Sequence, residues 1–474
     1  MYFLALATDY DGTIATEGAV EPETCAALED LKRTGRRLIL VTGRELPELL
    51  DVFPPIELFD IVVAENGALL YYPRTKEERV IAPPPSDKFI ARLASKNVMP
   101  VSVGRSIVAT WEPHQTAVLE AIHELGLELQ IIFNKGAVMV LPAGVNKATG
   151  LAAALEELHM SRHNVVGVGD AENDHAFLRA CGCSAAVANA LPMVKDTADI
   201  RLKGARGAGV AELVRMVMER DIAIVAPGRH GLVIGTESDG TEVHLGPASG
   251  SVLIAGRSDT TDLVAGLTRQ MSEREFHFCM LDSIGRYAEL EKAVSVGDAA
   301  TPPQTSEIDK LVVQGVNVVV NMSALDAGAR PAFVQSLLSE LQRKRAETGR
   351  PHWIVIDDAS ELLPAEHPGG ISIMAVSSAP ERIDARILRS FQAGLAAGRD
   401  APEVVARFAK SAVVPVPSPA PDEIVFWDPS RGPRLVNADG LLASGETVPS
   451  NISVIPAKAG ALGKKGHPPP RGGR

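Results

Sequence analysis

The stretch LALATDYDGTIA, residues 4–15, places two carboxylates, Asp9 and Asp11, directly after an apolar run. Such a run, followed by a glycine that permits a tight turn, predicts a buried strand that ends at the acids. Ligands of open parallel sheets bind at the carboxyl ends of the strands. Two neighbouring acids are costly there unless a cation or a proton-transfer role compensates. The alternative is an Asx turn, because Asp-Gly is a common turn.

Strands and helices alternate on either side of this stretch. We expect strands at Phe3–Thr8, Arg37–Val41, Ile61–Ala64, Asn164–Val168 and Ser184–Val187. The helices expected between them are Glu23–Lys32, Leu46–Val52, Lys147–Leu158 and Asp174–Ala180. Alternation with continuously apolar strands predicts an α/β fold, with a parallel sheet covered on both faces.

A different pattern interrupts this alternation. A helix expected at Ser86–Ser95 and two short strands are followed by a second such unit, which begins with a helix at Gln115–Leu125. This repeated helix–strand–strand unit predicts a small α+β layer of its own, inserted into the first domain as a cap.

Three further segments carry polar side chains at the end of a strand or the start of a helix. LILVTGRE puts Thr42 after a strand, PAGVNKATGL puts Lys147 at a helix start, and VVGVGDAENDHAF puts Asp170 and Asp174 after another strand. A hydroxyl can bond a phosphoryl oxygen, and a lysine at a positive helix end attracts anions. The alternatives are a helix cap for Thr42 and the two acids, and a solvated charge for Lys147. Because all of these segments carry polar side chains at a strand end or a helix start, their joint occurrence favours a phosphate-binding site.

The set DYDGT, TGR, NK and GDAEND resembles the haloacid dehalogenase (HAD) superfamily, in its sugar-phosphatase or Cof-like branch with a small inserted cap. The resemblance covers about residues 1–219, where AENGALLY and AVANALPMVKDTAD also fit. The cap is similar to that of archaeal-type phosphoglycolate phosphatases. This implies a Rossmann-like core at 1–74 and 146–219 and a cap at 75–145.

The resemblance also implies roles for individual residues. Asp9 would attack phosphorus, and Asp11 would protonate the leaving oxygen and later deprotonate water. Thr42 and Lys147 would neutralise charge on the phosphoryl group. The implied metal is Mg²⁺, held by Asp9, the backbone carbonyl of Asp11, Asp170 and, directly or through its support of Lys147, Asp174. The implied substrate-binding residues are Thr42, Gly43, Arg44, Asn66 and Lys147.

Residues 220–415 resemble, more faintly, a HerA/FtsK-like P-loop ATPase domain. The stretch RPHWIVIDDASELLP ends an apolar strand in two acids, Asp357 and Asp358, which would organise Mg²⁺ in an active ATPase; a capped strand-to-helix turn is the alternative. The loop departs from G-x-x-x-x-G-K-[ST], because Thr261, Asp262 and Leu263 replace the second glycine, the lysine and the hydroxyl residue. We therefore expect a P-loop fold that has lost the residues that bind phosphate. An extension at 416–455 and a disordered basic tail at 456–474 are expected to follow it.

Composition narrows the function further. The net charge of −12 argues against a general nucleic-acid binder. Four cysteines, at 25, 181, 183 and 279, are too few for a disulfide framework. No apolar run is long enough for a membrane span, and no leader is evident, so we expect a cytoplasmic protein.

The sequence thus predicts an enzyme. We expect a Mg²⁺-dependent phosphomonoester hydrolase acting on a small phosphorylated metabolite such as a sugar phosphate. The alternative is a regulatory protein whose second half binds a protein partner. A phosphotransferase or phosphonatase is a third interpretation, but Asp11 favours ester hydrolysis because a leaving alkoxide needs a proton. The sequence does not identify the substrate.

Overall fold

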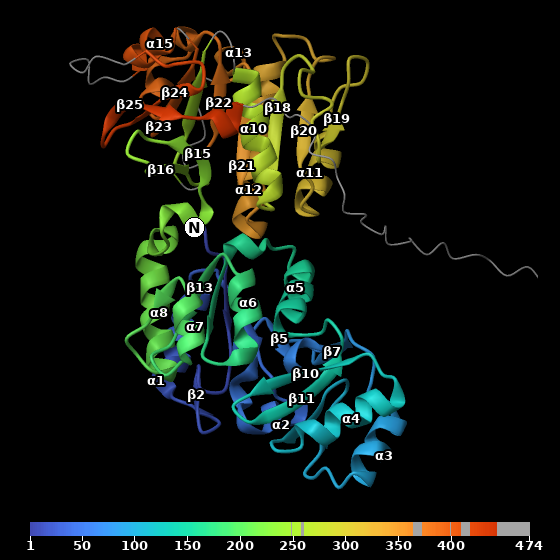
Figure 1. The fold of residues 1–474 in the computed structure, drawn as a ribbon. Helices are drawn as coiled ribbons and strands as arrows, with labels where there is room; N and C mark the ends of the chain where they lie inside the picture. The colour runs from blue at the N-terminus through green and yellow to red at the C-terminus, as the bar shows by residue number, and fades with distance from the viewer. Residues whose placement is uncertain (248, 257–259, 364–371, 399, 409–417, 443–474) are drawn as a thin grey trace, which may run out of the picture.

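The computed structural model describes residues 1–247, 249–256, 260–363, 372–398, 400–408 and 418–442 (Figure 1). The predicted basic tail and part of the predicted extension lie outside these residues. Figure 1 shows two α/β units, each built on its own sheet. We call the unit with the cap beside it the lower layer, and the unit above it the upper layer. Among the described residues, no helix has the length and apolar character that crossing a bilayer requires.

The lower layer is built on an eight-stranded sheet with the order β14-β13-β12-β1-β4-β5-β6-β7. The first six of these strands run parallel, and β6 and β7 are antiparallel additions. Along the chain they are β1 (Ala5–Thr8), β4 (Arg37–Val41), β5 (Ile61–Ala64), β6 (Leu69–Tyr72), β7 (Glu77–Val80), β12 (Val165–Gly169), β13 (Cys183–Ala186) and β14 (Ile200–Arg201). A short hairpin of β2 (Ala15–Thr16) and β3 (Ala19–Val20) follows β1. β1, β5 and β12 are buried throughout, which explains their continuously apolar sequences.

Helices cover this sheet, and α1 packs with α8 while α5 packs with α6. They are α1 (Pro22–Arg33), α2 (Leu46–Val52), α5 (Lys147–Glu157), α6 (His175–Ala180), α7 (Pro192–Thr197) and α8 (Arg206–Arg220). Short 3₁₀ turns lie at η1 (Pro54–Leu58), η2 (Glu65–Gly67), η3 (Arg162–Asn164) and η4 (Glu172–Asp174). Asn146 caps α5, because its side chain accepts hydrogen bonds from the backbone of Ala148 and Thr149. This cap fixes the helix start that carries Lys147.

The cap is a four-stranded antiparallel sheet with the order β10-β11-β9-β8, covered by two helices. Its elements are α3 (Asp87–Ser95), β8 (Ser102–Val103), β9 (Val108–Trp111), α4 (Gln115–Leu125), β10 (Leu129–Asn134) and β11 (Ala137–Pro142). The predicted cap boundary at residue 75 is too early. β7 pairs with β6 in the lower sheet, because the buried strand Leu69–Tyr72 needs a partner before the chain leaves for the cap.

The upper layer holds an eleven-stranded sheet with the order β16-β15-β25-β24-β23-β17-β22-β21-β18-β20-β19. From β23 to β19 the strands are parallel, and the other four add an antiparallel wing. The strands are β15 (Leu232–Thr236), β16 (Glu242–Leu245), β17 (Val252–Ala255), β18 (Phe278–Asp282), β19 (Val294–Val296), β20 (Val318–Asn321), β21 (Trp353–Ile356), β22 (Met374–Ser377), β23 (Ala393–Ala397), β24 (Glu423–Asp428) and β25 (Gly432–Asn437). Because β24 pairs with β23, the predicted separate extension from residue 416 belongs to this sheet as far as it is described.

The helical elements of the upper layer precede, connect and follow these strands. They are η5 (Asp221–Ile224), α9 (Pro227–His230), α10 (Thr260–Glu273), α11 (Thr305–Val313), α12 (Arg330–Thr348), α13 (Ala359–Leu362), η6 (Pro380–Arg382), α14 (Ala385–Leu388), α15 (Ala401–Phe408) and α16 (Asp439–Leu442). α12 packs with α11 and α13, and α10 packs with α16.

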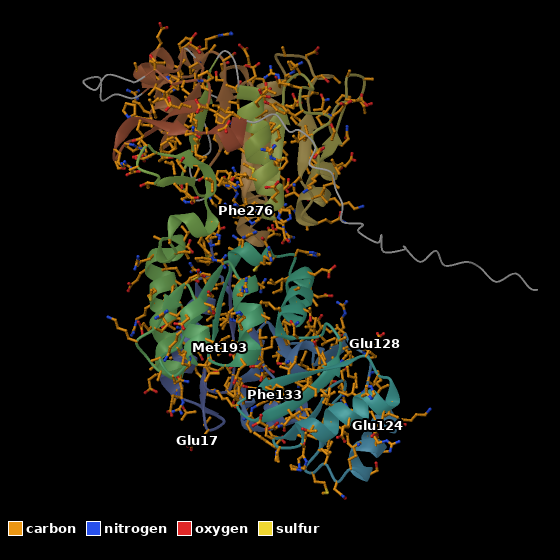
Figure 2. All side chains as sticks on the ribbon, viewed as in Figure 1. Glu17, Glu124, Glu128, Phe133, Met193 and Phe276 are labelled. Atoms are coloured by element: carbon orange, nitrogen blue, oxygen red, sulfur yellow. The ribbon has the colours of Figure 1, made fainter. Side chains whose placement is uncertain are left out.

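The two layers meet at the amino ends of their strands. The backbone N–H of Ser161, shortly before β12, donates to the carbonyl of Thr348, shortly before β21, at 3.1 Å. Gly349 lies so close that a Cβ there would stand 1.9 Å from Oδ1 of Asn164. Phe276, just before β18, is also at this junction (Figure 2). The carboxyl ends of both parallel sheets therefore point away from the junction.

Candidate active site

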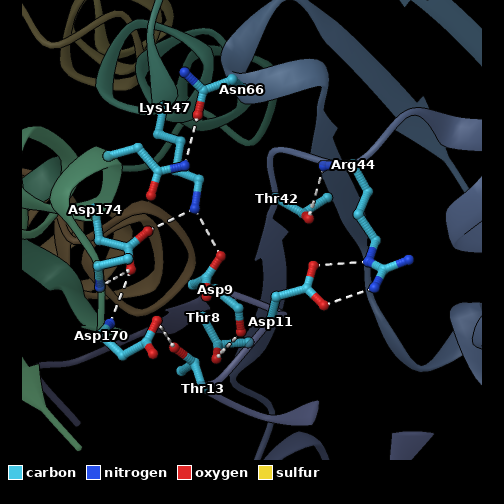
Figure 3. A network of polar contacts seen from close by, with 12 residues as sticks. Thr8, Asp9, Asp11, Thr13, Thr42, Arg44, Asn66, Lys147, Asp170 and Asp174 are labelled. Carbon is cyan, nitrogen blue, oxygen red and sulfur yellow. Dashed lines mark hydrogen bonds and ion pairs between the residues drawn. The ribbon is translucent and has the colours of Figure 1, made fainter. Parts of the chain in front are cut away.

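The four predicted motifs meet at the carboxyl edge of the lower sheet (Figure 3). Asp9 follows β1, Thr42 follows β4 and Asp170 follows β12, and β1 lies between the other two strands. Lys147, the first residue of α5, reaches the same edge. Parallel strands therefore bring together segments that are far apart in the sequence.

Lys147 links two carboxylates at this edge. Its Nζ donates to Oδ1 of Asp9 at 2.6 Å and to Oδ1 of Asp174 at 2.5 Å. The other carboxylate oxygen of Asp174 accepts from the backbone N–H groups of Asp170 and Ala171, at 2.8 and 2.9 Å. Asp174 thus ties the loop after β12 to the ammonium that contacts Asp9.

Burial determines the charge states in this group. Lys147 is only 1% exposed, and burial by itself would lower the pKa of its ammonium. Asp174 and Asp9 outweigh that effect and raise the pKa of Lys147, which therefore stays charged. Burial, with the neighbouring charge of Asp174, raises the pKa of Asp9, and Lys147 opposes this rise. The ammonium is therefore the main local stabiliser of a charged Asp9.

Three buried carboxylates cluster at the edge. Asp9, Asp170 and Asp174 each offer an oxygen, and these oxygens lie within 4.8 Å of one another. Burial raises the pKa of Asp170, although Lys135 opposes the rise. Three buried acids are unfavourable without a compensating cation, and carboxylate oxygens are the donors that Mg²⁺ prefers. This donor set fits Mg²⁺.

Asp11 is held by Arg44. The guanidinium donates from Nε and Nη2 to the two oxygens of Asp11, both at 2.7 Å, and Nη1 also contacts Glu48. The side chain of Asp11 is 42% exposed, so its carboxylate lies at the boundary between the buried edge and solvent. A group at this position is accessible both to a substrate and to water.

The other predicted phosphate-site residues lie on the loops after β4 and β5. Oγ1 of Thr42 accepts from the backbone N–H of Arg44 at 3.1 Å. Asn66 is fully buried in a left-handed conformation, and its Oδ1 accepts from Asn173 at 3.0 Å. Nδ2 of Asn66 has no hydrogen-bond partner among the described residues. This amide group is thus a buried hydrogen-bond donor beside the site that could donate to a bound ligand.

Gly12 is required by the close approach of two loops. Its φ is +85°, and a Cβ there would lie 2.3 Å from Oδ2 of Asp170. A larger residue would be strained and would displace the Asp170 carboxylate. The glycine of the DYDGT motif therefore brings the loop after β1 against the loop after β12.

The cap is anchored to the core through Glu65. This carboxylate is 1% exposed and accepts hydrogen bonds from the backbone N–H groups of Arg105 and Ser106, both at 2.8 Å, and of Ile107 at 3.2 Å. Gly104 also packs on it, since a Cβ there would lie 2.8 Å from the carboxylate. One core side chain thus fixes the cap loop that precedes β9.

A cavity of about 570 Å³ lies between the core edge and the cap. Asp9, Asp11 and Arg44 line its core side. The cap side is largely apolar and includes Ile107 and Met139. The nucleophile predicted from the sequence therefore faces a cavity large enough for a small metabolite.

Comparison with known proteins agrees with this geometry. The haloacid dehalogenase-like hydrolase family matches residues 6–103 and 108–214. A phosphoglycolate phosphatase of Methanothermobacter thermautotrophicus is 32% identical over 223 residues, which are 45% of this chain and 98% of that protein. The chain belongs to the haloacid dehalogenase-like hydrolases.

Two further similarities were found. Phosphoglycolate phosphatase 2 of Saccharolobus solfataricus is 27% identical over 222 residues, 45% of this chain and 92% of that protein. A solved haloacid dehalogenase-like hydrolase from Bacteroides thetaiotaomicron is 18% identical and covers 45% of this chain and 99% of its own, with a TM-score of 0.40. The chain is a haloacid dehalogenase-type phosphatase, and residues 215–474 lie outside the family match.

Some residues at the phosphatase site were not predicted from the sequence. Lys135, from the cap, donates to Oδ2 of Asp170 at 2.5 Å, and Asn189 donates to the same oxygen at 3.2 Å. Asn173 and Glu65 hold the loops described above. Asn173 stands within the recognised GDAEND motif and Glu65 within AENGALLY, so local sequence contained signals for these two. Lys135 could be recognised only as an unusual residue before Gly136 in a hairpin turn.

The second predicted acidic site lies at the carboxyl edge of the upper sheet. Asp357 is 1% exposed, and its Oδ1 lies 3.4 Å from Nη1 of Arg286. Burial raises the pKa of Asp357 to about 6, although Arg286 opposes the rise. Asp358 stands at the N-cap position of α13, without a side-chain capping hydrogen bond. The capped-turn interpretation thus fits the position of Asp358 but not the buried ion pair of Asp357.

The residues that replace the phosphate-binding signature begin α10. Thr261 and Asp262 lie in its first turn, and Leu263 is fully buried in the core. Residues 257–259, which precede this helix, lie outside the described residues. No cationic side chain stands at positions 261–263, so the first turn of this helix carries a net negative charge.

Proposed function

We propose that this chain is a Mg²⁺-dependent phosphomonoester hydrolase that works through a phosphorylated Asp9. The observation that carries the proposal is the bridge of Lys147 between Asp9 and Asp174, beside Asp170 at the carboxyl edge of the sheet. A buried nucleophile needs a neighbouring cation to stay charged and to balance charge in the transition state.

In the first half-reaction, a carboxylate oxygen of Asp9 attacks the phosphorus of the substrate. The bond between phosphorus and the ester oxygen breaks, and Asp11 gives its proton to that leaving oxygen. The hydroxyl of Thr42, the buried amide of Asn66 and the ammonium of Lys147 are the groups proposed to balance charge on the phosphoryl oxygens. The products are an alcohol and an aspartyl phosphate.

In the second half-reaction, Asp11 takes a proton from a water molecule. The water oxygen attacks phosphorus, and the bond between phosphorus and the Asp9 oxygen breaks. Inorganic phosphate leaves, Asp9 is restored and Asp11 is again protonated. Arg44 positions Asp11 for both transfers through its two hydrogen bonds.

The carboxylates of Asp9 and Asp170, with the proposed backbone carbonyl of Asp11, would hold Mg²⁺, while Asp174 supports the metal shell or Lys147. Bound Mg²⁺ supplies positive charge to the phosphoryl oxygens during transfer. We expect turnover to need Mg²⁺ and to stop in excess EDTA. Full activity in EDTA would contradict the metal proposal.

The covalent step is tested by Asp9→Asn. We expect turnover of p-nitrophenyl phosphate to fall about a thousandfold or more, with the fold retained, because only the attacking oxygen is lost. Asp51→Asn, which changes an exposed acid on α2, is the control and should leave turnover unchanged. More than roughly a tenth of the original activity in Asp9→Asn would overturn the covalent mechanism.

The substrate is a small phosphorylated metabolite, and the cap is proposed to select it. The relatives described above are named phosphoglycolate phosphatases, and sugar phosphates are the class expected from the sequence. A panel of phosphorylated metabolites would distinguish these. A cytoplasmic location stays a prediction from the sequence.

We propose that the second half has a P-loop-like fold that serves as a scaffold or binds a protein partner. β17 and β21 are separated by a single strand, β22, so the loop after β17 and the acids after β21 belong to one edge, as the resemblance implies. Asp262 and the ion pair of Arg286 with Asp357 both argue against catalysis of nucleotide hydrolysis there.

A further inference from the structure

The hairpin of β10 and β11 ends in a two-residue turn, Lys135–Gly136, which projects from the cap toward the catalytic edge. Asn134 pairs with Ala137, and the two turn residues have φ of +48° and +89°. Such turns favour asparagine or aspartate before glycine, because other side chains are strained in the left-handed conformation. A lysine at this position is therefore not explained by the turn itself.

The Lys135 side chain crosses from the cap to the core. Its Nζ lies 2.5 Å from Oδ2 of Asp170, and it would stand 2.8 Å from a Cβ built on Gly12. The side chain is 45% exposed and also lines the cavity. The ammonium thus stands between the carboxylate cluster and the space that receives the substrate.

Lys135 differs from the other charged side chains that line the cavity. Four acids line it: Asp9, Asp11, Glu45 and Glu48. Two cations line it, and one of them, Arg44, is engaged by both oxygens of Asp11 and by Glu48. Lys135 is paired with Asp170, the predicted metal ligand, and a divalent cation there would repel the ammonium toward the cavity.

We propose that Lys135 is a specificity-determining residue that binds a second anionic group on the phosphate ester. This inference rests on the proposed function, because it places the phosphoryl group at Asp9. The ammonium donates charge-assisted hydrogen bonds to a carboxylate on the leaving group, which the acidic core side of the cavity would otherwise repel. Substrates with a negative leaving group are therefore preferred over neutral esters of the same size.

The position of Lys135 also limits the length of the leaving group. Its partner Asp170 belongs to the carboxylate cluster that includes Asp9, whose oxygens lie within 4.8 Å of one another. A second anion must therefore lie only a few bonds from the ester oxygen. Of the cap side chains that line this cavity, Lys135 carries a positive charge, and the others are neutral.

Binding of a matched pair of esters tests the proposal. The full chain with Asp9→Asn is titrated by calorimetry, in Mg²⁺, with 2-phosphoglycolate and with its neutral analogue 2-hydroxyethyl phosphate. We expect Lys135→Met to weaken 2-phosphoglycolate binding about tenfold or more, as for loss of one charge-assisted hydrogen bond, and to change binding of the analogue little. Lys135→Arg should retain part of the preference. Lys88→Met, at an exposed cap position, is the control and should change neither.

Equal binding of the two esters by the parent, or no binding of 2-phosphoglycolate, would overturn the proposal. An equal loss for both esters in Lys135→Met, or a loss for neither, would overturn it as well. Turnover of p-nitrophenyl phosphate by the chain with Asp9 intact reports separately on the proposed function. Failure of that turnover would reject the hydrolase, whereas its persistence with unselective binding would reject only the role of Lys135.

Discussion

The ring of His163, in the lower layer, stacks on the ring of Phe276, in the upper layer, with centroids 4.1 Å apart and an interplanar angle of 23°. His163 also contacts the carbonyl of Arg274 through Nε2 at 2.9 Å. His352 and His230 surround the same pair of rings. The junction of the two layers is thus built around histidines that must be neutral to pack.

We expect the folded chain to lose stability as the pH falls below about 6.5. Burial, with the charge of Arg162, lowers the pKa of His163 to about 3, and burial lowers that of His230 to about 4. Since the unfolded chain binds these protons near pH 6.5, each excess proton lowers the free energy of unfolding by about 1.4 kcal/mol per pH unit. The contribution is complete above pH 6.5 and is lost as the pH falls toward the folded pKa values.

Thermal unfolding between pH 7.5 and pH 5 measures this effect. His163→Phe keeps an aromatic ring on Phe276 and should reduce the dependence on pH. His123→Gln, at an exposed position of the cap, is the control and should leave the dependence unchanged. An identical pH profile for His163→Phe and the parent would contradict the assignment.

Lys147→Met should abolish most of the activity and also destabilise the core. Removing a cation from the transition-state site commonly costs a factor of about 10²–10³ in kcat. It also leaves Asp9 and Asp174 buried without their partner, a loss of about 3–5 kcal/mol in comparable buried pairs. Steady-state kinetics and denaturant unfolding measure the two effects. A fully active and stable Lys147→Met would show that the bridge is dispensable.

Glu65→Gln should loosen the cap. The amide keeps one acceptor oxygen, and its NH₂ group then opposes a backbone N–H of the loop at Arg105–Ile107. We expect a higher KM, a smaller change in kcat, and faster amide hydrogen exchange in that loop. Glu78→Gln, which removes only a surface ion pair with Arg105, is the matched control. Unchanged exchange in Glu65→Gln would show that the contact does not hold the cap.

The second half should not hydrolyse ATP. The full chain with Asp9→Asn, which silences the phosphatase, is tested by calorimetry and phosphate release. Asp262 places a negative charge where a P-loop lysine would stand, and two such charges about 4 Å apart repel by roughly 4 kcal/mol at an effective dielectric of about 20. Leu263 is buried and provides no hydroxyl for Mg²⁺. Micromolar ATP binding with steady turnover, both lost in Asp357→Ala, would make the protein bifunctional.

The sequence predicted the phosphatase core well because its signals are local. The predicted elements that the structure shows with the same bounds include Arg37–Val41, Leu46–Val52, Ile61–Ala64 and Gln115–Leu125. The catalytic motifs each follow a strand or begin a helix. In a parallel sheet, such positions lie together at the carboxyl edge. Asp9, Lys147 and Asp174 could therefore be grouped before any contact was known.

Other features depend on contacts between distant segments and were not predicted. β7 is an exposed strand in which three of the four residues are charged, and its pairing with β6 places it in the core sheet. β24 pairs with β23 in the upper sheet, and the composition of the segment between these two strands gave no sign of this pairing. The contact of Lys135 with Asp170 likewise joins the cap to the core, and no local pattern fixes the position of the cap.

The junction at the amino ends of both sheets has a consequence for how the halves can influence each other. A ligand at Asp357 and a metabolite at Asp9 would lie at opposite ends of the two described halves. The two sites are therefore placed neither to pass a ligand directly between them nor to block each other's access. Among the described residues, coupling between the two sites would cross the junction contacts, which include Ser161 with Thr348 and His163 with Phe276. In the part of the chain that the structure describes, a partner bound to the upper half would therefore act on the phosphatase site from the amino ends of strands such as β12.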